Sequence, residues 1–77
     1  MKFGEAVEAL KDGCKVARHG WNGKGMWLTY IHGQKTTDAG YETLPLIAMK
    51  TADDKIVPWL ASQTDILAED WVLIVND

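Results

Sequence analysis

The stretch CKVARHGWNGKGMWLTYI, residues 14–31, is the part of the sequence that decides the fold. It contains two runs of strand-like composition, residues 14–18 and 26–31, on either side of an Asn-Gly pair. Asn-Gly between such runs is typical of a hairpin turn, because both residues tolerate positive φ. The stretch therefore predicts two antiparallel strands with residues 19–25 at the hairpin tip.

The strand expected over residues 26–31 is apolar on both faces. Its alternate side chains form two mainly apolar sets, Met26 with Leu28 and Tyr30, and Trp27 with Thr29 and Ile31. Because successive strand residues point to opposite faces, both faces of such a strand need cover. We therefore expect a second layer, supplied by this chain or by another copy of it.

The segment before these strands predicts an amphipathic helix over residues 3–12. Phe3, Val7 and Leu10 recur at helical spacing, and Ala6 and Ala9 widen the apolar stripe. Gly13 follows where a left-handed residue would end the helix. This helix is expected to pack one face on the sheet.

The rest of the chain predicts three more strands, over residues 44–49, 56–59 and 71–75, and a loop over 33–43. Pro45 and Pro58 should lie at strand ends or on edge strands, because proline donates no backbone hydrogen bond. The continuous apolar run at 71–75 is typical of a central strand. Ser62 is placed to cap a helical turn over residues 63–67, with Asp65 in its first turn.

Together these elements predict an α+β fold, within a single domain over residues 1–77. An N-terminal amphipathic helix packs on a small, mostly antiparallel sheet of four to five strands, and a short helical turn precedes the last strand. At about 25 cal/mol per Å², burial in a chain of 8.6 kDa contributes about 115 kcal/mol, and ordering the chain costs about the same. An isolated monomer would be marginal, so self-association is expected.

Composition excludes several classes of protein. The chain is 47% hydrophobic and 25% charged, with a net charge of −3 and Arg18 as its one arginine. It lacks the clustered basic face that gripping a DNA or RNA polymer requires. A single cysteine excludes a disulfide framework, and no apolar run is long enough to cross a membrane. We therefore expect a soluble cytoplasmic protein without a membrane partner.

Catalytic patterns are weak, so no enzyme, metal site or cofactor is predicted. Cys14 and His19 could be drawn as a nucleophile and base, but a small buried thiol in a strand explains Cys14 better. The carboxylate pairs Asp53-Asp54 and Glu69-Asp70 are chain neighbours, which point to opposite sides of an extended strand. Gly23-Lys24-Gly25 lacks the spacing of a phosphate-binding P-loop.

Binding chemistry is better supported, around the tryptophans. Trp21 lies at the expected tip between glycines, where an exposed indole can stack a purine, or where it can instead tuck under and close the core. Glycine amides there and Arg18, His19 and Lys24 suit phosphate. Trp71 follows two acidic residues and is open to either role, core or pocket. Trp59 and Trp27 are expected in the core, or for Trp27 at an interface.

Several ordered blocks of the sequence resemble a known family. They are residues 3–6, 9–10, 15–27 (KVARHGWNGKGMW), 49–53 (MKTAD), 56–59 (IVPW), 61–65 (ASQTD) and 67–71 (LAEDW). In this order they are similar to the Thoeris anti-defense 2 family of small phage and prophage proteins. The resemblance covers nearly the whole chain and is weakest over residues 31–46.

The resemblance implies a protein that sequesters a signal rather than an enzyme. Family members hold glycocyclic ADP-ribose signals of bacterial immune enzymes without cleaving them, and some also bind cyclic oligonucleotide signals at a separate place. They form homotetramers with pockets between protomers. Such a protein would act in the cytoplasm of the infected or prophage-carrying bacterium.

On this basis we assign hypothetical roles to ten residues. Trp21 and Trp71 would stack the base, and Asn22, Glu69 and Asp70 would read its polar groups or the ribose hydroxyls. Arg18, Gly23, Lys24 and Gly25 would bind phosphate, and Met26 would complete the pocket. The alternative is a protein–protein inhibitor or structural phage component that uses an exposed Trp21 as its contact point.

Overall fold

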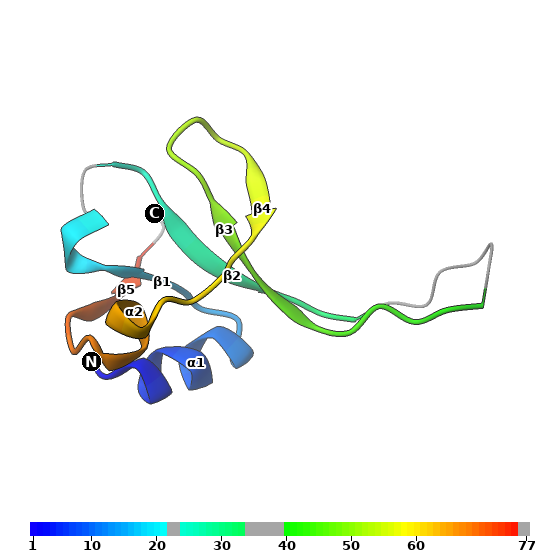
Figure 1. Ribbon diagram of the computed structural model, residues 1–77, viewed down its shortest axis with the longest axis horizontal. Coiled ribbons are helices and arrows are strands. Elements are labelled where there is room, and N and C mark those ends of the chain that lie inside the picture. The colour runs from blue at the N-terminus through cyan, green and yellow to red at the C-terminus, as the bar shows by residue number, and fades with distance from the viewer. Residues whose placement is uncertain (22–23, 34–39, 76–77) are drawn as a thin grey trace.

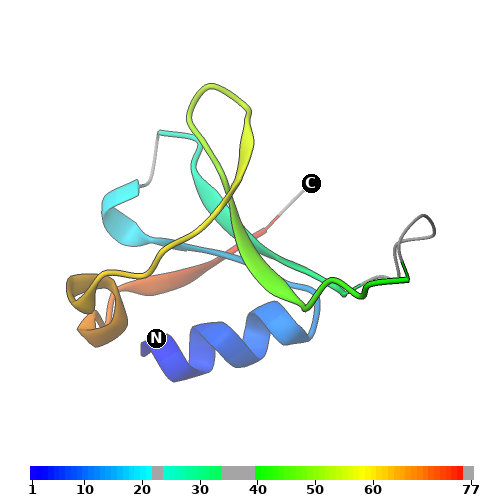
Figure 2. The same cartoon turned by 45° about the vertical axis from the view of Figure 1, so that its right-hand side comes forward.

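The computed structural model describes residues 1–21, 24–33 and 40–75. Its elements in chain order are α1 (Phe3–Lys11), β1 (Lys15–Arg18), the short 3-10 helix η1 (His19–Trp21), β2 (Trp27–Ile31), β3 (Leu46–Lys50), β4 (Ile56–Pro58), α2 (Gln63–Leu67) and β5 (Trp71–Ile74). The strands form one antiparallel sheet in the order β4-β3-β2-β1-β5, and Figures 1 and 2 show α1 running along one side of it. The predicted α+β class is confirmed.

Helix α1 ends where the sequence predicts. Gly13 has φ 95°, and its N–H donates to Leu10 O at 3.0 Å while Cys14 N–H donates to Ala9 O at 2.9 Å. These bonds satisfy carbonyls of the last turn, as left-handed glycine caps do. At the other end the Glu5 carboxylate accepts from Lys2 N–H at 3.0 Å. The helix is therefore capped at both ends by local contacts.

The hairpin between β1 and β2 is confirmed, and the residues that connect the two strands begin with a helical turn. Val16 pairs with Leu28 in an antiparallel register, and residues 19–26 connect the two strands. The connection begins with η1, so Trp21 lies in a helical turn rather than at an extended tip. Asn22 and Gly23, which were expected to form the turn, lie outside the described residues.

The last strand lies at an edge of the sheet and not at its centre, which corrects the sequence prediction. β5 pairs with β1 through four register pairs, from Lys15 with Ile74 to Arg18 with Trp71. A continuous apolar run usually indicates a strand buried on both sides. Here Trp71 is buried, but Val72 and Leu73 are 38% and 51% exposed, so the run is only partly covered.

The prolines and the second helix follow their sequence signals. Pro45 directly precedes β3, and Pro58 is the last residue of β4, the other edge strand. Ser62 Oγ accepts from Asp65 N–H at 3.1 Å and caps α2. The expected loop over 33–43 includes residues 34–39, which lie outside the described residues, and residues 40–45 project away from the sheet (Figure 1).

Both helices lie on the same face of the sheet, which we call the covered face. The buried cluster on it consists of Ala6, Leu10, Val16, Leu28 and Trp71, each at most 1% exposed. The rings of Phe3, Trp21 and Trp59 surround Trp71, and their centroids lie 5.5–5.9 Å from its ring centroid. Phe3 and Trp59 also contact each other, with ring centroids 6.1 Å apart. Trp59 therefore packs against the core, but it is half-buried rather than part of the buried cluster.

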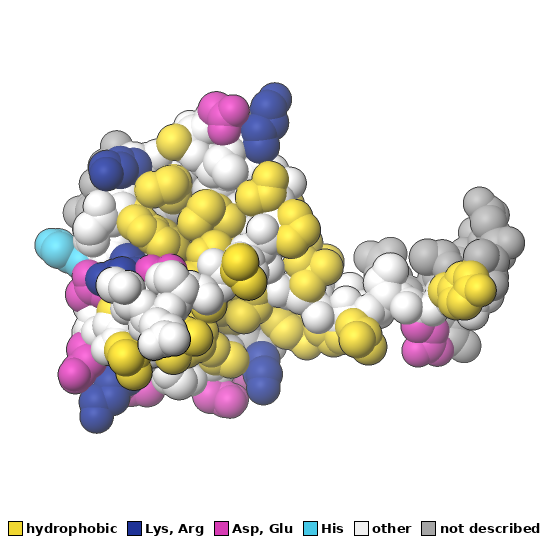
Figure 3. Space-filling view, viewed as in Figure 1, with side chains coloured by type: hydrophobic (Ala, Val, Ile, Leu, Met, Phe, Trp, Pro, Cys, Tyr) yellow, Lys and Arg dark blue, Asp and Glu magenta, His cyan; other side chains and the backbone are white. Residues whose placement is uncertain are grey.

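No described helix packs on the opposite face, which we call the open face. Strand alternation and the pairing register assign it these residues: Lys15, Ala17, Trp27, Thr29, Ile31, Leu46, Ala48, Lys50, Ile56, Pro58, Val72 and Ile74. Most of them are apolar, and Ile56 is 54% exposed. Figure 3, which has the same view as Figure 1, shows an apolar area over β3 and β4 that continues toward residues 40–45.

Two smaller observations complete the fold. Cys14 is exposed just before β1, so the expectation of a buried thiol within the strand is wrong. Its position after the helix-ending glycine keeps it off the sheet. Within the described residues, neither helix has the length and apolar character that a bilayer crossing demands.

Candidate functional site

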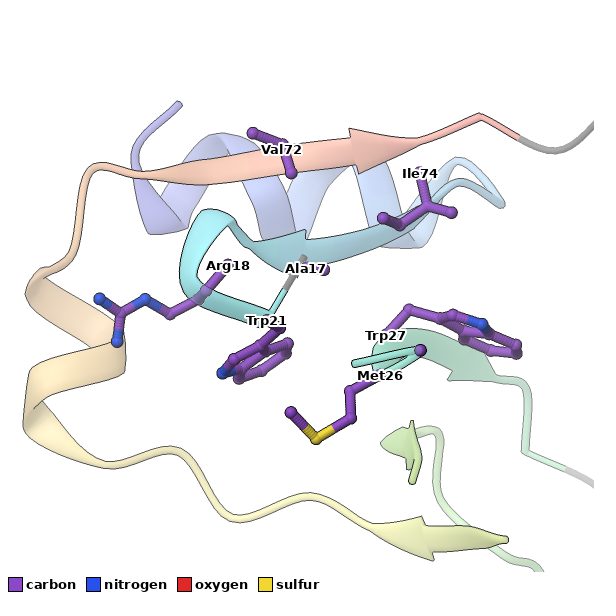
Figure 4. Close-up of a pocket in the computed structure, with 8 residues that line it drawn as sticks. Ala17, Arg18, Trp21, Met26, Trp27, Val72 and Ile74 are labelled. Atoms are coloured by element: carbon purple, nitrogen blue, oxygen red, sulfur yellow. The ribbon is translucent and has the colours of Figure 1, made fainter. Parts of the chain in front are cut away.

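A pocket of about 160 Å³ lies beside the end of β1, where the loop after η1 meets the open face of β1 and β5. Figure 4 shows its lining side chains, which are Ala17, Arg18, Trp21, Gly25, Met26, Trp27, Val72 and Ile74. Four of them, Arg18, Trp21, Gly25 and Met26, belong to the predicted binding set. The tertiary structure therefore brings together residues from the predicted loop with apolar residues of three strands.

Trp21 combines the two roles that its sequence position left open. Its ring packs edge-on against Trp71, with centroids 5.5 Å apart and planes at 83°, and it is part of the shell around the core. The side chain is nevertheless only half-buried and lines the pocket. A ring held by one neighbour and open on another side is a pre-oriented stacking surface.

Arg18 reaches from the end of β1 to two carboxylates near α2. Its Nε donates to Asp70 Oδ1 at 2.8 Å, and Nη1 donates to Asp65 Oδ1 at 2.9 Å. A longer bond of 3.4 Å joins Nη2 to Asp70 Oδ2. These contacts tie β1, α2 and the residue before β5 into one corner of the molecule.

The pKa values in this corner follow from the pairing. The pKa of Arg18 is raised above its ordinary value by the hydrogen bonds to Asp70 and Asp65. Burial acts to raise the pKa of Asp65, but hydrogen bonds from Arg18 and Ser62 outweigh it and hold it below the ordinary value. The pKa of Asp70 is lowered chiefly by its hydrogen bond with Arg18. All three groups therefore stay charged at neutral pH.

The other acidic and aromatic candidates lie apart from the pocket. Trp71 is 1% exposed, and its Nε1–H donates to Asp65 O at 3.0 Å, so the core interpretation holds and its ring does not face a ligand. Glu69 is exposed and lines a separate hollow beside Phe3 and Ile66. Asp70 is engaged with Arg18.

The loop that follows Trp21 supplies two more of the predicted residues. Gly25 has φ 70°, and its carbonyl accepts from Lys50 Nζ at 2.7 Å, which anchors the loop to β3. Lys24 is exposed, and its N–H donates to Trp21 O at 3.0 Å. Asn22 and Gly23 lie outside the described residues, so their predicted roles stay predictions.

Sequence reasoning missed the pocket wall formed by the strands. Ala17, Val72 and Ile74 share the open face because Ala17 pairs with Val72 and Lys15 with Ile74. Trp27 comes from β2, and Lys15 Nζ lies 4.3 Å from its ring centroid. Two-residue alternation in each strand was the available signal, but it could not show that β1 lies beside β5.

The nucleophile and base that the sequence suggested are not brought together. Cys14 and His19 flank β1 at opposite ends, roughly 15 Å of extended chain apart, so they do not form a nucleophile and base pair. In residues 1–21, 24–33 and 40–75, no cluster of three or more His, Cys, Asp or Glu side chains is arranged to hold a metal ion.

A second hollow of about 560 Å³ is a wide groove on the helix side of the sheet. Its lining includes Phe3, Tyr30, Ile47 and Trp59. It contains none of the predicted binding residues. The pocket at Trp21 is therefore the better candidate, although it is smaller.

Comparison with known proteins gives a match over most of the chain. The chain matches the Thoeris anti-defense 2-like domain over residues 1–74. It is 46% identical over 84 aligned positions to a protein of Bacillus phage SP01 named Thoeris anti-defense 2, covering 96% of this chain and 94% of the phage protein. The chain therefore belongs to the Thoeris anti-defense 2-like family.

Proposed function

We propose that this protein captures a cyclic ADP-ribose-type nucleotide signal and holds it without cleaving it, which blocks Thoeris-type anti-phage defence in the host cytoplasm. The observation that carries the proposal is that Arg18, Trp21, Gly25 and Met26 line one pocket. All four lie in residues 15–27, the longest of the blocks on which the resemblance to the family is based. Sequestration needs affinity rather than turnover, so a small pocket of this kind suffices.

The aromatic content of the pocket suits a purine. Trp21 is fixed against Trp71, and Trp27 contributes a second indole from the neighbouring strand. Stacking on an aromatic side chain contributes roughly 1–3 kcal/mol per base. A cyclic ligand also loses little conformational freedom on binding, which favours capture by a small protein.

The size of the pocket supports binding between copies of the chain. Pockets for ligands of drug size are roughly 300–1,000 Å³, so a hollow of about 160 Å³ holds one part of such a nucleotide. A second copy on the open face would cover apolar surface and supply the missing wall, in line with a homotetramer.

The charged groups near the pocket favour binding over hydrolysis. The lowered pKa values of Asp65 and Asp70 make both carboxylates weak bases at neutral pH. Both also accept hydrogen bonds from Arg18, which occupies the oxygens that would act on a substrate. These carboxylates are thus suited to structure and to polar contacts.

The direct test is a depletion and release experiment. Purified protein is mixed with glycocyclic ADP-ribose, the protein is removed by filtration, and the retained protein is then heated to release what it holds. We expect the ligand to leave the solution in stoichiometric amount and to return chemically intact. The same assay with cyclic oligonucleotide signals tests the second ligand class.

Other outcomes of this experiment separate the alternatives. Altered ligand after release would indicate an enzyme and contradict sequestration. No depletion would favour a protein–protein inhibitor or structural component. That alternative relied on an exposed Trp21 as its contact point, and the half-buried ring packed on Trp71 makes it weaker.

A variant pair assigns the binding to the pocket. Trp21→Ala removes the stacking surface and should weaken binding at least about tenfold, which corresponds to about 1.4 kcal/mol. Leu44→Ala is the matched control, because Leu44 is 81% exposed and lies by the groove on the helix side. Equal dissociation constants for both variants by calorimetry, with folded protein, would remove Trp21 from the site.

A further inference from the structure

The one arginine of the chain is already committed to carboxylates. Three of its nitrogens, Nε, Nη1 and Nη2, donate to Asp70 and Asp65 at 2.8–3.4 Å. With two carboxylates to one guanidinium, the group carries a net negative charge. The guanidinium has five N–H groups, so a phosphate that approached Arg18 would find two of them still unused, but it would stand beside two anions.

Lys50, a second cation near the pocket, is also paired with a carboxylate. Its Nζ lies 2.6 Å from Asp54 Oδ1 and donates to Gly25 O at 2.7 Å. It therefore anchors the loop rather than presenting a free charge.

Lys15 differs from both. Its ammonium lies 4.3 Å from the Trp27 ring centroid, and within the described part of the chain no carboxylate lies within ion-pair distance of it. Lys15 is not itself one of the residues that line the pocket, but it lies at the edge of the pocket. It pairs with Ile74 and packs on Trp27, and Ile74 and Trp27 both line the pocket. The side chain is half-buried, so its position is restricted by the indole below it.

A cation held in this way is well suited to an anion. The indole stabilises the ammonium without neutralising it, because a cation–π contact supplies no opposing charge. Ordering the long side chain in advance also lowers the entropy lost on binding. Lys24 is exposed on the loop and carries no such restraint.

We propose that Lys15, held on Trp27, is the anion subsite of the pocket and receives a phosphate of the bound nucleotide, whereas Arg18 acts as a positioning residue through Asp65 and Asp70. The proposal rests on the proposed function and names the cation that would bind the phosphate of the captured nucleotide. It revises the sequence-based hypothesis, which gave the phosphate to Arg18. The ligand class that follows is a nucleotide whose phosphate lies close to its stacked base.

The experiment compares two probes on four proteins by calorimetry. The probes are glycocyclic ADP-ribose and adenosine, which carries the base without phosphate. The proteins are the wild type, Lys15→Met, Lys11→Met and Arg18→Gln. Methionine keeps the aliphatic stem over the indole and removes the charge, and Lys11 on α1 is the matched control for the loss of one positive charge.

We expect Lys15→Met to weaken binding of the phosphate-bearing probe about tenfold and to leave adenosine binding unchanged. Raising the salt concentration should weaken wild-type binding more than binding by Lys15→Met, because the charge that salt screens has gone. Lys11→Met should match the wild type. Arg18→Gln should lower the melting temperature and leave the ratio of the two affinities unchanged.

Three results would overturn the subsite. The first is that Lys15→Met leaves the ratio of the affinities for glycocyclic ADP-ribose and adenosine unchanged. The second is that only Arg18→Gln removes the preference for glycocyclic ADP-ribose. The third is a smaller mass for Lys15→Met in sedimentation with the salt dependence of binding intact, which would assign Lys15 to contacts between copies. If the wild type binds neither probe, the proposed function itself fails, and the subsite fails with it.

Discussion

The covered and open faces of the sheet have similar apolar composition but different surroundings. On the covered face, Leu28 and Val16 are 0% exposed beneath α1, and Trp71 is 1% exposed. On the open face, Trp27 is half-buried under a lysine, and Val72 and Leu46 are 38% and 39% exposed. The difference arises because both short helices lie on one side.

This comparison explains how a chain of 77 residues can bury a core on one face of its sheet and keep apolar side chains accessible on the other. One face buries enough apolar surface to hold the sheet together. The other keeps aromatic and aliphatic side chains accessible for a ligand or a second copy. A large exposed apolar area on a small protein usually marks such an interaction surface.

The largest expected effect comes from replacing one tryptophan on each face. Trp71→Ala should lower the free energy of unfolding by about 3–5 kcal/mol, because it empties the centre of the aromatic cluster. Trp27→Ala should cost far less stability and should instead weaken ligand binding. Urea denaturation at a fixed protein concentration measures the free energy of unfolding of both variants. Equal losses of stability would show that the two faces do not differ in this way.

The second effect concerns assembly through the open face. Ile74→Asp places a carboxylate on that face, where burial against another copy would cost several kcal/mol. We expect a smaller assembly mass in sedimentation equilibrium, with an unchanged circular dichroism spectrum. Leu67→Asp on α2 is the control, since Leu67 is 76% exposed on the helix side. A reduced mass in the control alone would move the interface to the helix side.

The third effect is a loss of stability in acid at the Arg18 corner. Asp65 and Asp70 have pKa values below their ordinary value of 3.8 in the folded protein. As the pH falls, the two carboxylates therefore bind protons in the unfolded chain before they do so in the folded protein. The free energy of unfolding that they contribute is fully present above about pH 4 and is lost as the pH falls through their pKa values in the folded protein. Melting temperatures from pH 7 to pH 2.5 measure this.

A variant isolates the contribution of that corner to the acid profile. Asp65→Asn should be less stable at pH 7 and should show a shallower decline in acid than the wild type. Asp12→Asn, at the end of α1, controls for the loss of one negative charge. Parallel profiles for Asp65→Asn and the wild type would contradict the assignment.

The smallest effect is expected at the cap of α2. Ser62→Ala removes the acceptor for Asp65 N–H and should cost about 1 kcal/mol of unfolding free energy. Because α2 carries Asp65, a slight loss of ligand affinity should accompany it. Ser62→Thr, which keeps the hydroxyl, should restore most of the stability in the same denaturation assay. No recovery would indicate a role for Ser62 other than capping.

Local signals explain which elements were predictable. The spacing of Phe3, Val7 and Leu10, the glycine at position 13 and the cap at Ser62 act within a few residues, so the sequence shows them directly. The prolines also marked strand ends correctly. The buried position of Cys14 and the central position of β5 were wrong, because burial depends on which strands become neighbours.

The candidate site shows the same division. The loop around Trp21 and Gly25 was predictable because glycines and an indole in a connection indicate binding. The strand wall with Ile74 and Val72 was not, since the pairing of β1 with β5 joins residues more than 50 positions apart. The ion pairs of Arg18 with Asp65 and Asp70 depend on the same pairing of β1 with β5.

The sequence by itself determined the helix, the strands, their antiparallel character and the family, because each depends on local spacing or on ordered blocks of residues. Only the tertiary structure decided which apolar face is covered, that Trp71 is core while Trp21 borders a pocket, and that Arg18 is neutralised while Lys15 is not. The physical reason is that burial and charge pairing are set by residues distant in the chain that pack together only once the sheet has formed.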